Sequence, residues 1–212
     1  MTPAPKRPDR QSALSLVEDA RMDCVLALAE TAPAEADHCF QVMYLALELF
    51  DQLQPLHGLD SDARFLLAGG ALLHDIGRAA GARAHHKISQ RLILAAPLPE
   101  LSEREKNILA CLARHHRRSA PSVKHQHFVA LPDGDKRLVR VLAGILRVAD
   151  GLDRRHLRAV HDIYCEVLPD KIVLRCDVAG PAETERDVAL EKGDVFEEVF
   201  QRSLAIEWRN GP

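Results

Sequence analysis

The sequence has few aromatic residues and lacks long apolar runs, paired cysteine motifs and a strong net charge. Aromatic residues make up 4% of the 212 residues, whereas 47% are hydrophobic, so a core must be built mainly from Leu, Ala, Val and Ile. This composition favours helices over a β-sandwich or a β-barrel. The length suits one ordinary domain with a small appendage.

These shortages exclude several classes of protein. The formal net charge is −3 at pH 7, which gives no reason to expect bulk nucleic-acid binding. No apolar run is long enough to span a membrane. The basic start of the chain is not followed by the apolar h-region of a signal peptide, so none is expected. The five cysteines form no Cys-x-x-Cys pair, which is typical of a reduced protein without disulfides. The expected location is therefore the cytoplasm.

Hydrophobic periodicity predicts a helical domain over residues 13–160, preceded by a Pro- and charge-rich tail, 1–12, that is expected to be disordered. The predicted helices cover 16–30, 37–53, 60–74, 87–96, 102–116 and 135–152. Ser102 and Glu105 have the spacing of a capping box. Residues 119–134 contain two prolines and a glycine and are expected to form a long loop.

The pattern changes after residue 160. Two β-branched runs, 163–168 and 171–178, flank Pro169-Asp170 and predict a hairpin. An amphipathic helix is expected over 193–204 and a short strand over 205–208. Residues 161–212 are therefore expected to form a small α+β appendage, and the fold class is mostly α.

Histidine and aspartate residues recur at the predicted helix ends. His74 and Asp75 stand together after an apolar run and just before a glycine. The other candidates along the chain are His38, His85, His86, His115, His116 and Asp150. Side chains from the ends of different helices can meet in one cleft, and imidazole nitrogen and carboxylate oxygen are good ligands for divalent cations.

Each candidate alone also has a simpler explanation. His38 could be a surface residue near a helix start, and Asp150 could pair with a neighbouring arginine. The pair at 85–86 could be solvated, and the pair at 115–116 could be cations that a helix end stabilises. A series with a member on nearly every predicted helix makes a metal site the preferred interpretation.

The order of a lone His, a His-Asp pair and a distant Asp resembles the pattern of the HD-domain metal-dependent phosphohydrolases. The pattern maps onto His38, His74, Asp75 and Asp150. A closer resemblance is to the C-terminal helical domain of the exopolyphosphatase and guanosine-pentaphosphate phosphatase family. It is carried by the stretches 47–53, 71–77, 85–89, 92–94, 114–118, 146–154 and 194–200, and it covers about residues 13–210.

The resemblance implies an HD-domain helical bundle that binds divalent metal ions. HD domains with two metals have additional histidine ligands between the His-Asp pair and the last Asp. The implied ligands are His38, His74, Asp75, His86, His115, His116 and Asp150, with Asp75 placed to bridge two ions. Mn, Fe, Ni, Zn or Mg would suit these ligands, and one ion or none stays an alternative. Ser119-Ala120-Pro121 stands where cyclic-dinucleotide phosphodiesterases have Gly-Tyr-Pro, which argues against that substrate.

The implied function is a metal-dependent phosphohydrolase. His74, Asp75 and Asp150 are expected to carry catalysis, with a metal-bound hydroxide as the nucleophile. The cations expected to hold substrate phosphates are Arg78, Lys87, Arg117, Arg118 and Arg147. The expected substrate is a phosphoanhydride or a phosphoester, such as polyphosphate, a nucleotide or a small phosphorylated metabolite.

Two other functions stay open. Family members usually carry an actin-like domain that performs the catalysis, while the helical domain helps to hold the polyphosphate. We find no counterpart of the actin-like domain in these 212 residues. The chain could therefore be a non-catalytic, regulatory domain that binds polyphosphate or nucleotides. It could also be a dimerisation domain that forms a homodimer through its C-terminal part.

Overall fold

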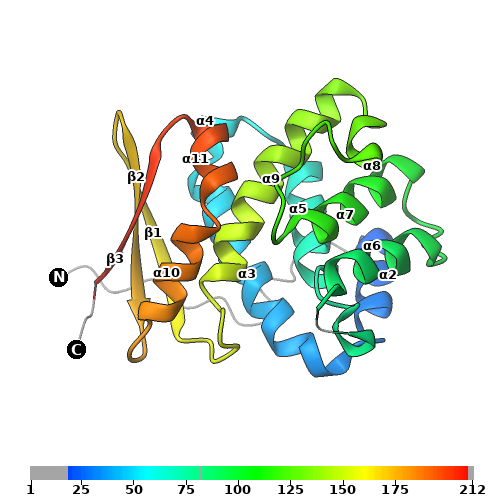
Figure 1. The fold of residues 1–212 in the computed structure, drawn as a ribbon, viewed down its shortest axis with the longest axis horizontal. Helices are drawn as coiled ribbons and strands as arrows, with labels where there is room; N and C mark the ends of the chain where they lie inside the picture. Colours follow the sequence, from blue (N-terminus) through cyan, green and yellow to red (C-terminus); the bar gives the residue numbers. More distant parts are fainter. Residues whose placement is uncertain (1–18, 82, 210–212) are drawn as a thin grey trace.

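The structure is a computed structural model that describes residues 19–81 and 83–209. The tail predicted to be disordered and the first residues of the helix predicted from residue 16 lie outside the described residues. Over the described residues the protein is mostly helical, with a three-stranded sheet in its C-terminal part, which confirms the predicted fold class (Figure 1). None of the described helices is both long enough and apolar enough to cross a membrane.

The helices before residue 160 are α2 (Ala20–Ala29), α3 (Ala36–Gln52), α4 (Gln54–His57), α5 (Ser61–Leu73), α6 (His85–Ala95), α7 (Glu103–His115), α8 (Gln126–Val129) and α9 (Asp133–Gly151). Two 3₁₀ turns cover Pro33–Glu35 and Arg78–Ala80. The C-terminal part consists of β1 (Val160–Val167), β2 (Lys171–Val178), α10 (Glu183–Glu191), α11 (Asp194–Phe200) and β3 (Ser203–Trp208).

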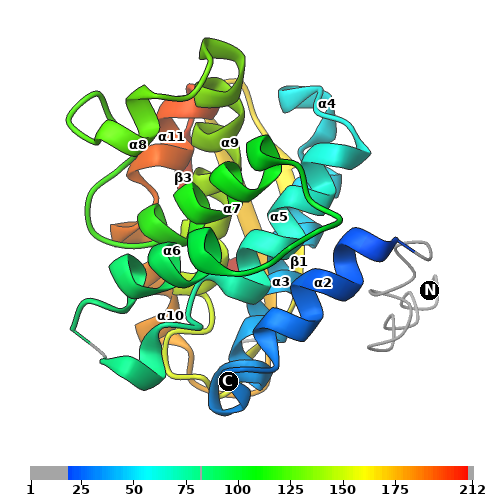
Figure 2. The same cartoon turned by 90° about the vertical axis from the view of Figure 1, so that its right-hand side faces the viewer.

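The central helix of the bundle is α5, which contacts α2, α3, α7 and α9 (Figure 2). From Ala63 to Leu73 all of its residues except Arg64 are buried. A helix that is apolar around most of its circumference is expected in a core rather than at a surface. The helix therefore leads His74 and Asp75, which follow its last turn, into the interior of the protein.

Local signals explain most of the helix boundaries. The capping box that the sequence predicts at the start of α7 is present, with Ser102 and Glu105 bonded to each other's backbone N–H. Three predictions about boundaries were wrong. Helix α6 begins at His85 rather than near residue 87, and α8 forms inside the stretch expected to be a loop. Helix α11 ends at Phe200 because the next residue, Gln201, adopts a left-handed conformation with φ 52°.

The sheet has the strand order β1-β2-β3. Strands β1 and β2 pair antiparallel as the predicted hairpin, and β3 pairs parallel to β2. Helices α10 and α11, which contact both β3 and α9, connect the sheet with the bundle (Figure 1). Buried residues of the sheet such as Ile172 and Leu174 belong to the same apolar cluster as Leu49 and Leu142 of the helices. The C-terminal part thus packs directly on the bundle, and a domain boundary after residue 160 stays a prediction.

Candidate metal centre

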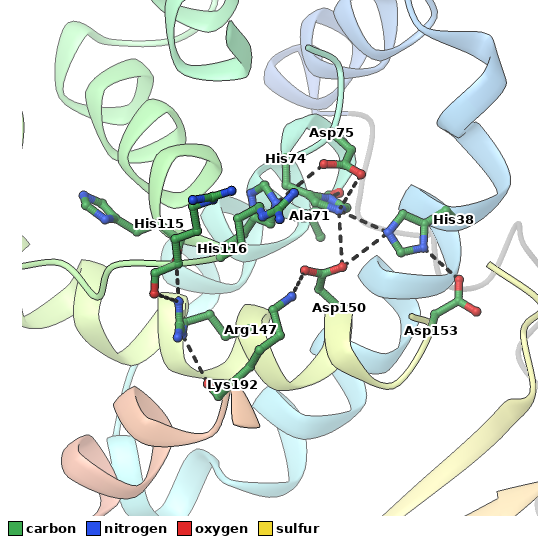
Figure 3. A network of polar contacts seen from close by, with 12 residues as sticks. His38, Ala71, His74, Asp75, His115, His116, Arg147, Asp150, Asp153 and Lys192 are labelled. Atoms are coloured by element: carbon green, nitrogen blue, oxygen red, sulfur yellow. Dashed lines mark hydrogen bonds and ion pairs between the residues drawn. The ribbon is translucent and has the colours of Figure 1, made fainter. Parts of the chain in front are cut away.

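Several helix ends bring the candidate ligands together (Figure 3). His38 lies in the first turn of α3, and Asp150 lies in the last turn of α9. His74 and His116 are the residues at which α5 and α7 end, and Asp75 follows His74 directly. His85, the first residue of α6, joins them. These six residues form two groups whose ligand atoms lie within 4.8 Å of one another in each group: His38, His74 and Asp150 in the first, and Asp75, His85 and His116 in the second.

The first group contains two imidazoles that face each other. His38 Nε2 and His74 Nε2 are 3.3 Å apart. Asp150 Oδ1 lies 3.4 Å from His38 Nε2 and 3.9 Å from His74 Nε2. The second carboxylate, that of Asp75, approaches this group through Oδ2, which lies 3.9 Å from His74 Nε2.

The second group surrounds the other oxygen of Asp75. Asp75 Oδ1 lies 3.0 Å from His85 Nε2 and 3.5 Å from His116 Nε2. The two imidazole nitrogens are 3.2 Å from each other. One carboxylate therefore directs a different oxygen at each group, which is the arrangement required of a ligand that bridges two cations.

Hydrogen bonds at Nδ1 decide the tautomer of three of these histidines. His74 Nδ1 lies 2.7 Å from the carbonyl oxygen of Ala71, and His116 Nδ1 lies 2.8 Å from that of Ala113. A carbonyl oxygen can only accept, so both Nδ1 atoms carry the proton. His38 Nδ1 donates in the same way to the carboxylate of Asp153, at 2.9 Å. Each of the three Nε2 atoms can thus present a lone pair to the centre, as in histidines that ligate metals.

The donor set fits divalent cations. Asp75 Oδ1 is buried and accepts no well-directed hydrogen bond from the described residues, although two imidazoles surround it. Buried polar atoms are normally satisfied, so an orphaned carboxylate oxygen among convergent nitrogen lone pairs is explained by a cation between them. Histidine and aspartate ligands without thiolate suit Mn, Fe, Ni, Zn or Mg.

Electrostatic interactions keep both carboxylates charged. Burial would raise the pKa of Asp75, but the interactions of this carboxylate with the surrounding imidazoles of His74, His85 and His116 outweigh burial and hold that pKa well below its usual range. Burial would likewise raise the pKa of Asp150, but neighbouring cations, with Lys192 first among them, hold it low. The centre therefore retains two negative charges at neutral pH.

The histidines of the centre respond differently to burial. Burial lowers the pKa of His74 and that of His116, so both imidazoles are neutral and able to ligate. Burial also lowers the pKa of His38, but Asp150 and Asp153 outweigh it and raise that pKa to about 9. A positive charge is thus favoured at His38, and a proton and a metal ion compete for its Nε2 lone pair.

Close backbone contact brings α6 to the centre. A Cβ atom added to Gly77 would come within 2.5 Å of the amide nitrogen of Ser89 and 2.6 Å of the carbonyl oxygen of His85. The N–H of Gly77 also donates to the Ser89 hydroxyl at 3.0 Å. Only glycine allows this approach, which holds the first residue of α6 against Asp75.

A pocket of about 280 Å³ opens beside the two carboxylates. It is lined by Asp75, Arg78, His85, His116, Arg117, Arg118, Asp150, Arg154, His156, Val188, Glu191 and Lys192. Three of the predicted phosphate-binding residues, Arg78, Arg117 and Arg118, are among them. Arg78 pairs with Asp75 at 3.3 Å, and one Arg117 nitrogen lies 3.3 Å from His85 Nε2.

The structure does not bring three other predicted residues to the centre. His86 is buried next to His85, but its Nδ1 has no partner among the described residues, and the residue is in neither ligand group. His115 turns to a separate cluster, where its Nε2 lies 3.0 Å from His127 Nε2. Lys87 is exposed on α6 and does not line the pocket.

Arg147 also lies outside the pocket. Its side chain is buried and donates to the backbone carbonyl oxygens of His115, Arg118 and Lys192 at 3.2–3.3 Å. It forms an ion pair of 2.8 Å with Asp194. The guanidinium thus joins segments behind the pocket instead of facing a substrate.

Sequence reasoning missed three residues that bear on the site. Asp153 orients His38, and its place three residues after Asp150 in the same helix-end motif could have drawn attention to it. The ring of His156 stacks on that of His38 with centroids 3.7 Å apart. Lys192, at the end of α10, forms an ion pair with Asp150. No signal pointed to Lys192, because α10 itself was not predicted.

A comparison with known families matches most of the chain. The family model described as "Ppx/GppA phosphatase, domain III" matches residues 20–198. The match contains both ligand groups and all residues that line the pocket. It also extends over β1, β2 and α10 of the C-terminal part.

Proposed function

This chain belongs to the Ppx/GppA phosphatase family, in the part described as domain III, and from that premise we propose that it is a metal-dependent phosphohydrolase of the HD type. It would bind two divalent cations and hydrolyse a phosphoanhydride or phosphoester, such as polyphosphate, a nucleotide or a small phosphorylated metabolite. The observation that carries the proposal is the position of Asp75, which directs one carboxylate oxygen at each of two ligand groups.

The ligands would be His38, His74 and Asp150 for one cation, His85 and His116 for the other, and Asp75 for both. Bound there, divalent cations would lower the pKa of a water molecule and neutralise charge on a phosphate. The rings of the three histidines anchored at Nδ1 need not turn in order to ligate, because each Nε2 atom already faces the centre, and His38 would lose its Nε2 proton when a cation binds.

The residues of the pocket would orient the water and the substrate. Asp75 and Asp150 are ionised and can only accept hydrogen bonds, so each would bind a water molecule through its protons and leave an oxygen lone pair free. Arg78, Arg117 and Arg118 would hold phosphate oxygens with planar, permanently charged guanidinium groups. Their positive charge would then lie next to the carboxylates, in the pocket where we propose that the phosphate binds.

Metal analysis combined with a phosphate-release assay tests the proposal. Asp75→Asn keeps the shape of the side chain but removes the charge shared by both groups, so it should lose bound metal and turnover while the circular dichroism of the helices is unchanged. The matched control is Asp51→Asn, because Asp51 forms a surface ion pair with Arg64 at 2.8 Å. The substrate panel should include pyrophosphate, long-chain polyphosphate, nucleotides and phosphomonoesters.

The second candidate is a binding domain for polyphosphate or nucleotides without catalytic activity. It is favoured by the cations that line the pocket, Arg78, Arg117, Arg118, Arg154 and Lys192, and by a family match to domain III. A wild-type protein that holds no metal and releases no phosphate, but binds polyphosphate more weakly as salt increases, would establish this function instead.

A further inference from the structure

Lys192 reaches the centre from the C-terminal part of the chain. The residue follows the last turn of α10, and its ammonium group forms an ion pair with Asp150 Oδ2 (Figure 3). The other oxygen of Asp150, Oδ1, faces His38 at 3.4 Å and His74 at 3.9 Å. The two oxygens of one carboxylate thus have different partners, so the lysine and a cation bound by the histidines need not compete.

The backbone of Lys192 is held from two sides. A Cβ atom added to Gly151 would come within 2.5 Å of Ala189 Cα, so α9 and α10 touch three residues before Lys192. The carbonyl oxygen of Lys192 accepts a hydrogen bond of 3.2 Å from Arg147 Nε. The position of the lysine is therefore fixed relative to α9, which also carries Asp150.

Arg147 connects this segment with a second segment that lines the pocket. The same guanidinium donates to the carbonyl oxygens of His115, at 3.2 Å, and Arg118, at 3.3 Å. Arg118 lines the pocket and has a left-handed backbone conformation with φ 59°, which a non-glycine residue adopts only when its surroundings hold it there. One buried side chain thus holds the backbone of two segments that line the pocket.

Resting on the function proposed above, we propose that Lys192 binds a phosphate group of the substrate and positions Asp150, and that Arg147 positions Lys192. The ammonium group has three donors, of which Asp150 occupies one. About 15% of the Lys192 side chain is exposed, and the residue lines the pocket, so the other donors can reach a phosphate oxygen. The C-terminal part is therefore a component of the site rather than an appendage.

Binding of inorganic pyrophosphate to the full chain in the presence of manganese tests the proposal by calorimetry. Lys192→Met should weaken pyrophosphate binding about tenfold, because a hydrogen bond between charged groups is lost. Manganese affinity should change less than pyrophosphate affinity, since the proposed ligand atoms are all present. Lys192→Arg should restore most of the pyrophosphate affinity, and Lys192→Gln, which is polar but neutral, should not.

The control is Lys136→Met, which removes a lysine that pairs with Asp133 on the surface at 2.9 Å, and it should leave pyrophosphate binding unchanged. Arg147→Lys should also weaken pyrophosphate binding, because a single ammonium group cannot span three carbonyl oxygens and a carboxylate. If the wild type turns over, both Lys192→Met and Arg147→Lys should raise KM more than they lower kcat.

Two results would overturn the proposal. One is unchanged pyrophosphate binding in Lys192→Met with an intact fold. The other is tighter manganese binding in that variant without loss of pyrophosphate affinity, which would mean that the Lys192 ammonium group occupies the position of a metal ion. A wild type that binds pyrophosphate but releases no phosphate from any substrate would refute the proposed hydrolysis and leave the proposed role of Lys192 in binding unaffected. A wild type without affinity for pyrophosphate would refute the role proposed for Lys192, whereas the phosphate-release panel decides separately whether the protein hydrolyses another phosphorylated substrate.

Discussion

Replacing Asp153 with asparagine tests whether the Asp153 carboxylate sets the tautomer of His38 and thereby its ability to bind a metal ion. The Asp153 side chain is 1% exposed, and both of its oxygens accept hydrogen bonds. Oδ2 accepts from His38 Nδ1 at 2.9 Å, and Oδ1 accepts from the backbone N–H of Arg158 at 2.8 Å. Asparagine has the same shape but only one accepting oxygen, so it cannot satisfy both donors.

Either orientation of the asparagine amide has a consequence that can be measured. With its NH₂ group towards His38, the imidazole must accept at Nδ1 and carry its proton on Nε2, which removes the lone pair that faces Asp150. With its NH₂ group towards Arg158, two donors oppose each other in a buried place. Loss of a partner that orients a ligand typically lowers metal affinity about 10–100-fold, or about 1.4–2.7 kcal/mol.

The assay is competition for Mn²⁺ or Zn²⁺ between the protein and a chromogenic chelator. Asp153→Asn should lower the affinity for the cation that His38 would bind by the stated factor. Asp162→Asn is the matched control, because Asp162 accepts a hydrogen bond from Tyr44 on the bundle side of β1 and is in neither ligand group. Equal affinities in Asp153→Asn and the wild type, with both folded, would refute the reasoning that the Asp153 carboxylate sets the tautomer of His38.

Three further outcomes are expected. Removal of metal with a chelator should lower the Tm of the wild type by about 5–10 °C in differential scanning calorimetry. This shift corresponds to the roughly 2.7 kcal/mol by which a ligand at a hundredfold excess over its Kd stabilises the folded state. His74→Ala should show no such shift. Burial lowers the pKa of His57 from 6.5, so the contribution of this residue to stability is fully present above pH 6.5 and is lost as the pH falls towards the lower pKa of the folded state. Urea unfolding at several pH values should therefore show that the stability of His57→Gln is less sensitive to acid than that of the wild type. Parallel curves of stability against pH would contradict this. Gly77→Ala should reduce the free energy of unfolding by about 1–3 kcal/mol through the clash with α6 and weaken metal binding. Gly134→Ala, where a Cβ atom meets no neighbour within 4 Å and the residue lies in α9, should reduce neither the free energy of unfolding nor metal binding.

The sequence was sufficient to predict which helix ends carry the residues of the candidate centre. The apolar run before His74 predicts a buried helix, and the residues that follow it must then lie in the interior. Ser102 and Glu105 predict where α7 begins, and a helix of normal length from there ends near His116. These are local signals, so they need no knowledge of tertiary contacts.

The choice between adjacent histidines could not be predicted. Neighbouring residues on a helix point about 100° apart, so the phase of the helix must be known to within one residue. The helix expected from about residue 87 begins at His85, and that difference left His85 and His86 undistinguished. For the same reason, the sequence could not tell that His116 joins Asp75 while His115 faces His127.

The contribution of the C-terminal part had no sequence signal. Helix α10 buries only Glu185 and Ala189, so it lacks the apolar stripe by which periodicity reveals a helix. The carbonyl oxygens that bind Arg147 come from residues 115, 118 and 192, which no local pattern brings next to residue 147. A charged side chain on an apolar helix was therefore interpreted as a substrate ligand, whereas its contacts are with the backbone.

At His74 and His116, a single hydrogen bond both ends the helix and orients the imidazole as a ligand. The last turn of a helix leaves carbonyl oxygens without an intrahelical donor, and each of these histidines satisfies the one three residues back through Nδ1–H. A histidine at a helix end is often explained by the favourable interaction of its positive charge with the helix dipole. That explanation does not apply here, because burial lowers the pKa of both residues and keeps them neutral. The neutral ring terminates the helix with one nitrogen and, because that nitrogen holds the proton, presents the other nitrogen's lone pair to the centre.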